Sequence, residues 1–400
     1  MKFTKKILKN GLVVLHEKRD VPVTTVMLAS KYGSAYESES DKGVAHFIEH
    51  LCFKGTKKRN TLQIASEVEK VGGILNAFTH EEVTAYHVKL PSDHLALAMD
   101  VIFDIYFNPI FPEEDVKREA FVICEEIKMY KDHPRAYVLE KLKEGLYEKP
   151  FGMFIAGTES NVKSFSREKI LKIHRETYCP ENSILCVVGN NSFSDVLKFA
   201  KKYSSEIEAR TFRKKEMLSI AKKNLNFEEK RANLEQANLA IGFHFPLANS
   251  EEKYSAEVFN TILGGGMSSR LFTEVREKRG LAYAVKTELD LGTKYGYFLI
   301  YIGTDKNKVD EVIKICLEEF YKMENVSEKE LEEGKQQLLG NKKVHSEEGE
   351  DTAVNLVLSE IHGKAEDYYG YDENIKKVAI KNLKNLLKIK EYSLSVLVPQ

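Results

Sequence analysis

The chain has 400 residues, which at roughly 150 residues per domain indicates two or three domains. Its 60 Lys and Arg residues nearly balance 61 Asp and Glu residues, and the net charge of −1 argues against a nucleic-acid binder that depends on bulk basicity. No apolar run approaches the roughly 20 residues that span a bilayer, and the N-terminal apolar stretch is too short for a secretory signal. Five scattered cysteines without a C-x-x-C pair favour a reducing compartment. We therefore expect a cytoplasmic globular protein with no nucleic-acid or membrane partner.

The first half of the chain alternates short strand patterns with helical ones. An Asn10-Gly11 turn predicts an N-terminal hairpin, because this dipeptide favours the tight turns that join antiparallel strands. The apolar periodicity that follows predicts a series of strands and helices. The expected elements are a strand over 23–32, helices over 43–54 and 61–71, a hairpin of 74–78 with 83–90, helices over 93–107, 112–130, 134–147 and 166–178, and a strand over 183–188.

The second half repeats this order at a distance of about 210 residues, which is too long for a solenoid repeat. The expected elements are a strand over 238–245, helices over 250–263 and 268–278, a hairpin of 283–291 with 296–301, helices over 306–323, 327–344, 347–362 and 374–389, and a strand over 393–398. We expect two similar α+β domains over 1–205 and 231–400, joined by a charged linker over 206–230. Each should be a largely antiparallel sheet covered by helices on one face.

One short segment in the first half carries the spacing of a metal site. His46 and His50 are four residues apart in an expected helix and therefore share one face of it. Two imidazoles at this spacing suit one zinc ion. Glu49 borders the same face, where a carboxylate can act on water without being a ligand. We therefore expect zinc at His46 and His50, with Glu49 as a catalytic group.

A catalytic zinc usually has a third protein ligand and one open position. The expected helix over 112–130 offers Glu119 and Glu126, which lie two turns apart on one face. We assign Glu126 as the third ligand and place Glu119 behind it, as a catalytic partner that orients a histidine. Glu125 and Glu82 remain competing carboxylates, because spacing alone does not exclude them.

These motifs resemble those of the M16 (pitrilysin or insulinase) peptidases, which include relatives of mitochondrial processing peptidase. His46 to His50 is similar to the inverted zinc motif of that family. The resemblance extends over almost the whole chain and both halves. The segments that carry it are Arg118-Glu119 through Glu125-Glu126-Ile127, Gly72 to Thr79, Gly157-Thr158-Glu159, Tyr178 to Asn182, Leu263 to Phe272, and Arg276 through Gly280 to Tyr283.

The resemblance implies roles for particular residues of this chain. It implies that His46, His50 and Glu126 bind zinc and that Glu49 is the general base. It also implies contacts with a peptide substrate, made by Asn76, Ala77, Phe78, Arg276 and Tyr283. An extended peptide would then add to the strand that carries Asn76–Phe78. The second half shows no comparable His and Glu cluster, so we expect one zinc per chain.

The leading hypothesis is a zinc endopeptidase that hydrolyses short or unfolded peptides. The resemblance implies a homodimer that encloses a chamber with composite active sites, in which the second domain of one chain faces the zinc of the other. The alternative is a non-catalytic assembly subunit of a processing-peptidase-like complex. Such a subunit would have no need of the zinc motif together with Glu126, Arg276 and Tyr283. The sequence leaves the natural substrate and the cleavage specificity open.

Overall fold

A computed structural model describes residues 2–205, 207 and 215–400. Part of the expected linker, residues 206 and 208–214, lies outside the described residues. The chain forms two compact units that interleave along the sequence. Unit 1 comprises Met1–Ile127, Phe154–Leu218 and His345–Tyr368, and unit 2 comprises Lys128–Met153, Ser219–Val344 and Tyr369–Gln400.

Unit 1 is built on a six-stranded sheet in the order β1-β2-β6-β3-β5-β4, in which β4 is an edge strand. Its pairs are antiparallel except for β2 with β6. The strands are β1 (Lys2–Ile7), β2 (Val13–Lys18), β3 (Val23–Ser30), β4 (Ile74–Thr79), β5 (Thr84–Pro91) and β6 (Ser183–Gly189). The helices are α1 (Val44–Cys52), α2 (Thr61–Glu69), α3 (Leu95–Phe107), α4 (Glu113–Asp132, in this unit as far as Ile127), α6 (Glu159–Ser164), α7 (Arg167–Thr177), α8 (Phe193–Ser205) and α12 (Gly349–His362).

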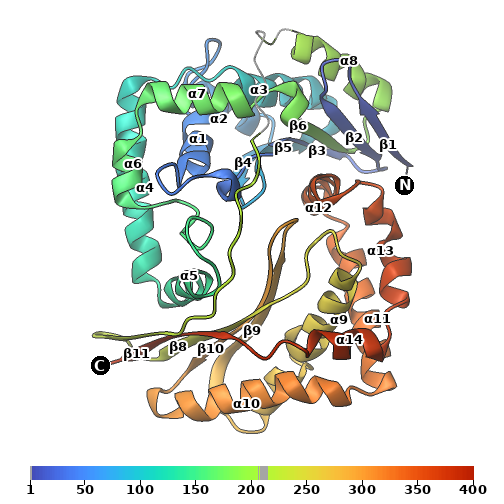
Figure 1. Ribbon diagram of the computed structural model, residues 1–400. Helices are drawn as coiled ribbons and strands as arrows, with labels where there is room; N and C mark the ends of the chain where they lie inside the picture. Colours follow the sequence, from blue (N-terminus) through green and yellow to red (C-terminus); the bar gives the residue numbers. More distant parts are fainter. Residues whose placement is uncertain (1, 206, 208–214) are drawn as a thin grey trace. The chain divides into compact units, whose positions relative to one another are not determined.

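Both faces of the unit 1 sheet are covered by helices (Figure 1). Side chains alternate between the faces of a strand, and Val26 and Leu28 of β3 join the core that contains α1 and α3. Met27 and Ala29 point to the other face and pack with Leu356 of α12. The sheet is therefore the middle layer of unit 1, with α12 on the face opposite α1.

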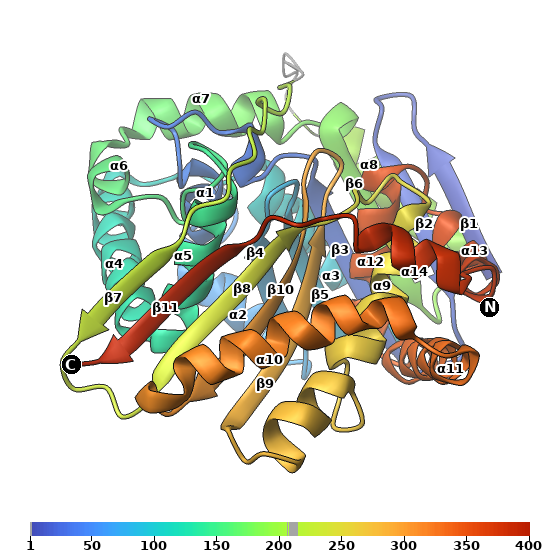
Figure 2. The same cartoon turned by 60° about the horizontal axis from the view of Figure 1, so that its bottom comes forward.

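Unit 2 is built on a five-stranded sheet in the order β7-β11-β8-β10-β9 (Figure 2). Its pairs are antiparallel except for β7 with β11. The strands are β7 (Phe227–Arg231), β8 (Ala237–His244), β9 (Ala282–Leu291), β10 (Gly296–Thr304) and β11 (Ser393–Pro399). The helices are α5 (Pro134–Leu146), α9 (Glu252–Gly264), the π-helix η4 (Phe272–Glu277), α10 (Val309–Lys322), α11 (Glu328–His345), α13 (Asp367–Lys376) and α14 (Ile380–Leu386).

Helix α5 packs on one face of the unit 2 sheet at a glycine. A Cβ on Gly242 of β8 would come within 2.9 Å of Leu146 and 3.0 Å of Leu142, so the missing side chain admits the helix. The neighbouring Phe243 points to the opposite face, where it stacks on Phe320 of α10 with ring centroids 3.9 Å apart. This sheet too is a middle layer between helices.

The expected α+β class and the largely antiparallel sheets are confirmed. The expectation that helices cover one face of each sheet was wrong, because helices cover both faces. The helices on the second faces come from the other half of the sequence, α12 in unit 1 and α5 in unit 2. The expected helix over 374–389 is interrupted, because Ala379 is extended between α13 and α14. Strand β7 begins inside the expected linker. None of the described helices combines the length and apolar composition needed to cross a membrane.

Candidate metal centre

The site is built on α1, whose first turn is held by a buried carboxylate. Gly43 precedes the helix at φ 100°, a left-handed conformation that favours glycine, and it has no side chain to cap the helix. Glu37 takes over this role by accepting hydrogen bonds from the backbone N–H groups of Gly43 (2.9 Å) and Ala45 (2.7 Å). A Cβ on Gly43 would lie 2.4 Å from the carbonyl oxygen of Ala156. The start of the helix is therefore fixed from two sides.

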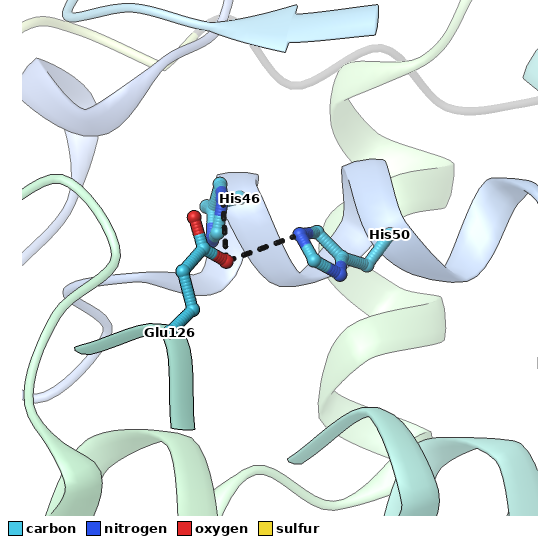
Figure 3. Close-up of side chains that lie close together, drawn as sticks. All are labelled: His46, His50 and Glu126. Atoms are coloured by element: carbon cyan, nitrogen blue, oxygen red, sulfur yellow. Dashed lines mark ion pairs between the residues drawn. The ribbon is translucent and has the colours of Figure 1, made fainter. Parts of the chain in front are cut away.

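Two histidines on α1 and one glutamate on α4 converge at the centre of the site (Figure 3). Oε2 of Glu126 lies 3.8 Å from Nε2 of His46 and 3.6 Å from Nε2 of His50. One ligand atom from each of these residues lies within 4.8 Å of the other two. Within the part of the chain that the structure describes, this is the one group of three or more His, Cys, Asp or Glu side chains that could hold a metal ion.

The donor set fits zinc. Two ligand atoms at about 2.1 Å from a tetrahedral ion are separated by roughly 3.4 Å, which is close to the distances from Glu126 to the imidazoles. Burial, together with the neighbouring His50, lowers the pKa of His46 to about 3, so this ring is neutral and able to donate a lone pair. Burial raises the pKa of Glu126, opposed by His50. A bound cation would relieve that cost by stabilising the carboxylate.

Glu119 contacts the second nitrogen of His50. Its Oε2 lies 3.2 Å from Nδ1 of His50, and its Oε1 lies 2.8 Å from Nζ of Lys54. Burial alone would raise the pKa of Glu119, but these two contacts hold it below its usual value. The carboxylate is therefore ionised and can accept a hydrogen bond from the Nδ1–H group of His50, which leaves Nε2 of His50 as the lone-pair donor facing Glu126.

Glu49 lies on α1 beside this cluster and is held from β4. Its Oε2 accepts a 2.5 Å hydrogen bond from the hydroxyl of Thr79. Burial raises the pKa of Glu49, whereas the hydrogen bond from Thr79 and the nearby His50 lower it. A carboxylate with a raised pKa takes up a proton more readily than an ordinary glutamate, and Glu49 lies directly beside the cluster.

Asn76, Ala77 and Phe78 lie on β4, which pairs with β5 on one side only among the described residues. The turn bond from the N–H of His80 to the carbonyl of Val83 fixes which residues of β4 bond to β5. By alternation Asn76 and Phe78 bond to β5, whereas the backbone of Ala77 faces the free edge. The N–H of Ala77 donates there to Oδ1 of Asn76 at 2.9 Å.

Arg276 and Tyr283 lie together in unit 2. The guanidinium of Arg276 lies over the ring of Tyr283, 5.0 Å from its centroid, and over Phe272 at 4.8 Å. Its Nη1 donates to the carbonyl of Tyr283 at 3.2 Å, and the Tyr283 side chain is 77% exposed. The two residues thus form one exposed cationic and aromatic group at the start of β9.

The two competing carboxylates lie outside the cluster. Glu125 is exposed on α4, and Glu82 pairs with His362, 3.0 Å from its Nε2. Glu37, Lys54 and Thr79 also contact the site and are not among the site residues expected from the sequence. Lys54 follows His50 by one helical turn, and Thr79 follows Ala77 on the same face of β4, so local periodicity offered a signal for both. Glu37 had no such signal, because it reaches α1 from a separate loop.

Two histidines and a carboxylate with a further glutamate beside them are typical of zinc-dependent hydrolases. Comparison with known families agrees with this class. Residues 12–159 match the family described as "Insulinase (Peptidase family M16)", and residues 164–338 match "Peptidase M16 inactive domain". The chain belongs to the M16 peptidase family.

Relatives similar in sequence are named as proteases. An uncharacterized zinc protease of Rickettsia bellii is 36% identical, over 84% of this chain and 81% of its own. An uncharacterized zinc protease of Bacillus subtilis is 32% identical, over 98% of this chain and 97% of its own. The names of these relatives agree with a zinc-dependent peptidase.

Solved structures show that the fold is shared at low sequence identity. A protease from Helicobacter pylori matches with a TM-score of 0.92 at 21% identity, over all of both chains. A structure from Pseudomonas fluorescens titled as a peptidase M16 inactive domain matches with a TM-score of 0.90 at 19% identity, over 100% of this chain and 98% of its own. At these identities the likeness concerns the fold alone.

Proposed function

We propose that this protein is a zinc-dependent endopeptidase that hydrolyses short or unfolded peptides, with one zinc ion per chain. The observation that carries the proposal is the convergence of His46, His50 and Glu126 from two helices, with Glu49 beside them. Zinc bound by these three residues would act as a Lewis acid, polarising the peptide carbonyl and making water more acidic. The remaining chemistry belongs to the residues of the chain.

Glu49 is the general base of the proposed reaction. Its half-buried carboxylate accepts a proton from the attacking water and returns it to the amine of the departing product. The carboxylate of Glu119 accepts a hydrogen bond from the Nδ1–H group of His50 and so fixes the tautomer and the orientation of that ring. In this assignment Glu119 is a positioning residue and does not touch the substrate.

The free edge of β4 is the proposed binding strand for the peptide. An extended peptide that pairs with β4 would bond to the outward backbone groups of Ala77 and, by alternation, to those of Leu75 and Thr79. The backbones of Asn76 and Phe78 bond to β5 instead, while the side chain of Asn76 lies at the free edge, where it accepts from the N–H of Ala77. Main-chain pairing of this kind is tolerant of sequence, which suits unfolded peptides.

We further propose a homodimer with composite active sites, to which Arg276 and Tyr283 of the second subunit contribute. The exposed cationic and aromatic pair supports this assignment, because guanidinium and phenol groups donate hydrogen bonds to substrate carbonyls and to a developing oxyanion. The dimer explains how residues in both halves of the sequence serve one reaction. Specificity would then depend on side chains from both subunits.

A cytoplasmic location belongs to the same proposal. All five cysteines are buried, and none of them forms a disulfide in the part of the chain that the structure describes. Burial raises the pKa of the Cys186 and Cys316 thiols well above the usual value. Protonated, buried thiols are suited to a reducing compartment, where no disulfide has to form.

The second candidate is a non-catalytic assembly subunit. The family described as an inactive domain matches residues 164–338, which supports a non-catalytic role for that part of the chain. The intact cluster in the first half favours catalysis. A subunit that binds zinc without cleaving any peptide of a diverse library would support the structural role.

The deciding experiment is cleavage of an internally quenched peptide library by the zinc-loaded protein, with cut sites mapped by mass spectrometry. We expect cleavage that stops on addition of a chelator and returns with zinc. Glu49→Gln is the matched control, because it keeps all three zinc ligands and removes the base. Equal cleavage by Glu49→Gln and the wild type would refute the assignment.

A further inference from the structure

Resting on the proposed function, we propose that Thr79 is a positioning residue that holds Glu49 in register with a peptide paired to β4. The inference starts from the place of Thr79 at the end of the edge strand. Its hydroxyl donates to Oε2 of Glu49, 30 residues earlier in the chain. Glu49, the proposed base, is therefore hydrogen-bonded to the strand that would bind the substrate.

Strand alternation explains why Thr79 points to α1. Leu75 and Ala77 pack against the core that contains α1, and Thr79 follows on the same side of β4. Phe78 packs against the core on the α12 side instead. A side chain at position 79 must therefore approach α1 as long as β4 keeps its register with β5, which is set by the pairs Ala77 with Tyr86 and Thr79 with Thr84.

The backbone of Thr79 faces the free edge for the same reason as that of Ala77. Residues 77 and 79 both occupy positions at which β4 does not bond to β5, since His80 and Val83 form the hydrogen-bonded pair at the turn. A peptide that pairs with β4 would thus bond to the main chain of Thr79, whose side chain bonds to Glu49. One residue then joins the substrate to the base directly.

Glu49 needs this contact because it has little else to orient it. Among the described residues, Thr79 is the hydrogen-bond donor to its carboxylate. The neighbouring ionisable groups, His50 and Glu126, belong to the cluster itself. Without the hydroxyl, rotation about the Glu49 side chain is restrained only by packing, and the carboxylate samples positions away from the attacking water.

The test compares Thr79→Val, which has nearly the same shape and no hydroxyl, with Thr79→Ser, which keeps the hydroxyl. We measure kcat and KM on a quenched peptide, zinc affinity by competition with a chelator, and the thermal midpoint. We expect Thr79→Val to lower kcat at least tenfold, with KM and zinc affinity within about twofold of the wild type. We expect Thr79→Ser to keep kcat within about threefold.

Several results would overturn the inference. An unchanged kcat in Thr79→Val would show that catalysis does not require the hydroxyl of Thr79. An equal loss of kcat in both variants would make packing, rather than the hydrogen bond, the function of Thr79. A weaker zinc affinity that accounts for the lost activity would mean that Thr79 supports the metal cluster and not Glu49.

A second readout separates this inference from the proposed function. A double-mutant cycle of Thr79→Val and Glu49→Ala on the free energy of unfolding measures the coupling between the two side chains without any turnover. We expect the two effects to be non-additive. Additive effects would refute the contact. A coupled pair in a zinc-loaded wild type that cleaves no peptide would refute the peptidase assignment, and with it the catalytic role of Thr79, while leaving the contact in place.

Discussion

Oε2 of Glu119 lies 3.2 Å from Nδ1 of His50, while Nε2 of the same ring lies 3.6 Å from Glu126. The carboxylates of Glu119 and Glu126 thus lie next to different nitrogens of one imidazole. Lys54, 2.8 Å from the other oxygen of Glu119, keeps that carboxylate ionised. This chain of contacts sets which nitrogen of His50 carries the proton and which one is available to a metal.

Replacing Glu119 should weaken zinc binding although Glu119 is not a ligand. We expect Glu119→Gln to lower zinc affinity roughly 10- to 100-fold, because the neutral amide no longer stabilises the tautomer and the orientation of His50. Glu125→Gln is the matched control, since it removes an exposed carboxylate from the same helix. Chelator competition measures both affinities. Equal affinities in the two variants would contradict the assignment.

Glu37 should make the stability of the metal-free protein depend on pH. Burial raises the pKa of Glu37 to about 7, against the opposing effects of Lys42 and the N–H groups of Ala45 and Gly43. Between about pH 4.5 and pH 7 the folded state therefore binds more protons than the unfolded state. The free energy of unfolding should fall as the pH rises through this window, by up to about 3 kcal/mol.

The matched variant for this effect is Glu37→Gln, which cannot ionise. Denaturant titrations at pH 5 and pH 8 give the free energy of unfolding of each protein. We expect the wild type to lose more stability than Glu37→Gln over this range. The same loss in both proteins would show that Glu37 does not titrate there.

Much of the fold follows from local pattern. The spacing of His46 and His50 requires only that one segment be helical, and that of Glu119 and Glu126 requires the same of another. The hairpin of β4 with β5 follows from alternation in the same way. These are short-range properties, and the structure brings His46, His50 and Glu126 into one cluster.

The features that local sequence patterns do not reveal depend on long-range packing. An apolar stripe on α12 does not specify which sheet it covers, and in unit 1 it packs on the apolar side chains of Met27 and Ala29 of β3. The exchange of α5 and α12 between the halves therefore had no local signal. The same holds for Glu37, whose contact with α1 exists only because the intervening loop folds back across the Gly43 backbone.

The edge of β4 can be tested by removing one backbone donor. The N–H of Ala77 faces the free edge, so Ala77→Pro removes a donor to the peptide without breaking a bond to β5. We expect KM to rise roughly tenfold, the equivalent of one hydrogen bond, with unchanged zinc affinity. Ala77→Ser keeps the N–H and serves as the control. A wild-type KM in Ala77→Pro would exclude pairing of the peptide at this position.

Composite sites predict complementation between two inactive variants. Glu49→Gln disables the base in unit 1, and Arg276→Ala removes the guanidinium in unit 2, so each homodimer should be inactive. In a heterodimer one of the two sites combines an intact Glu49 with an intact Arg276 from the other subunit. After random subunit exchange, half of the dimers are heterodimers, and we expect about a quarter of wild-type activity.

The control for complementation mixes Glu49→Gln with Glu126→Ala, in which both lesions lie in unit 1 and no site is restored. Differently tagged subunits establish by sequential affinity capture that heterodimers have formed. Activity in the first mixture and none in the second places Arg276 in the partner's site. If captured heterodimers of Glu49→Gln and Arg276→Ala stay inactive, Arg276 serves the zinc cluster of its own chain or does not serve catalysis.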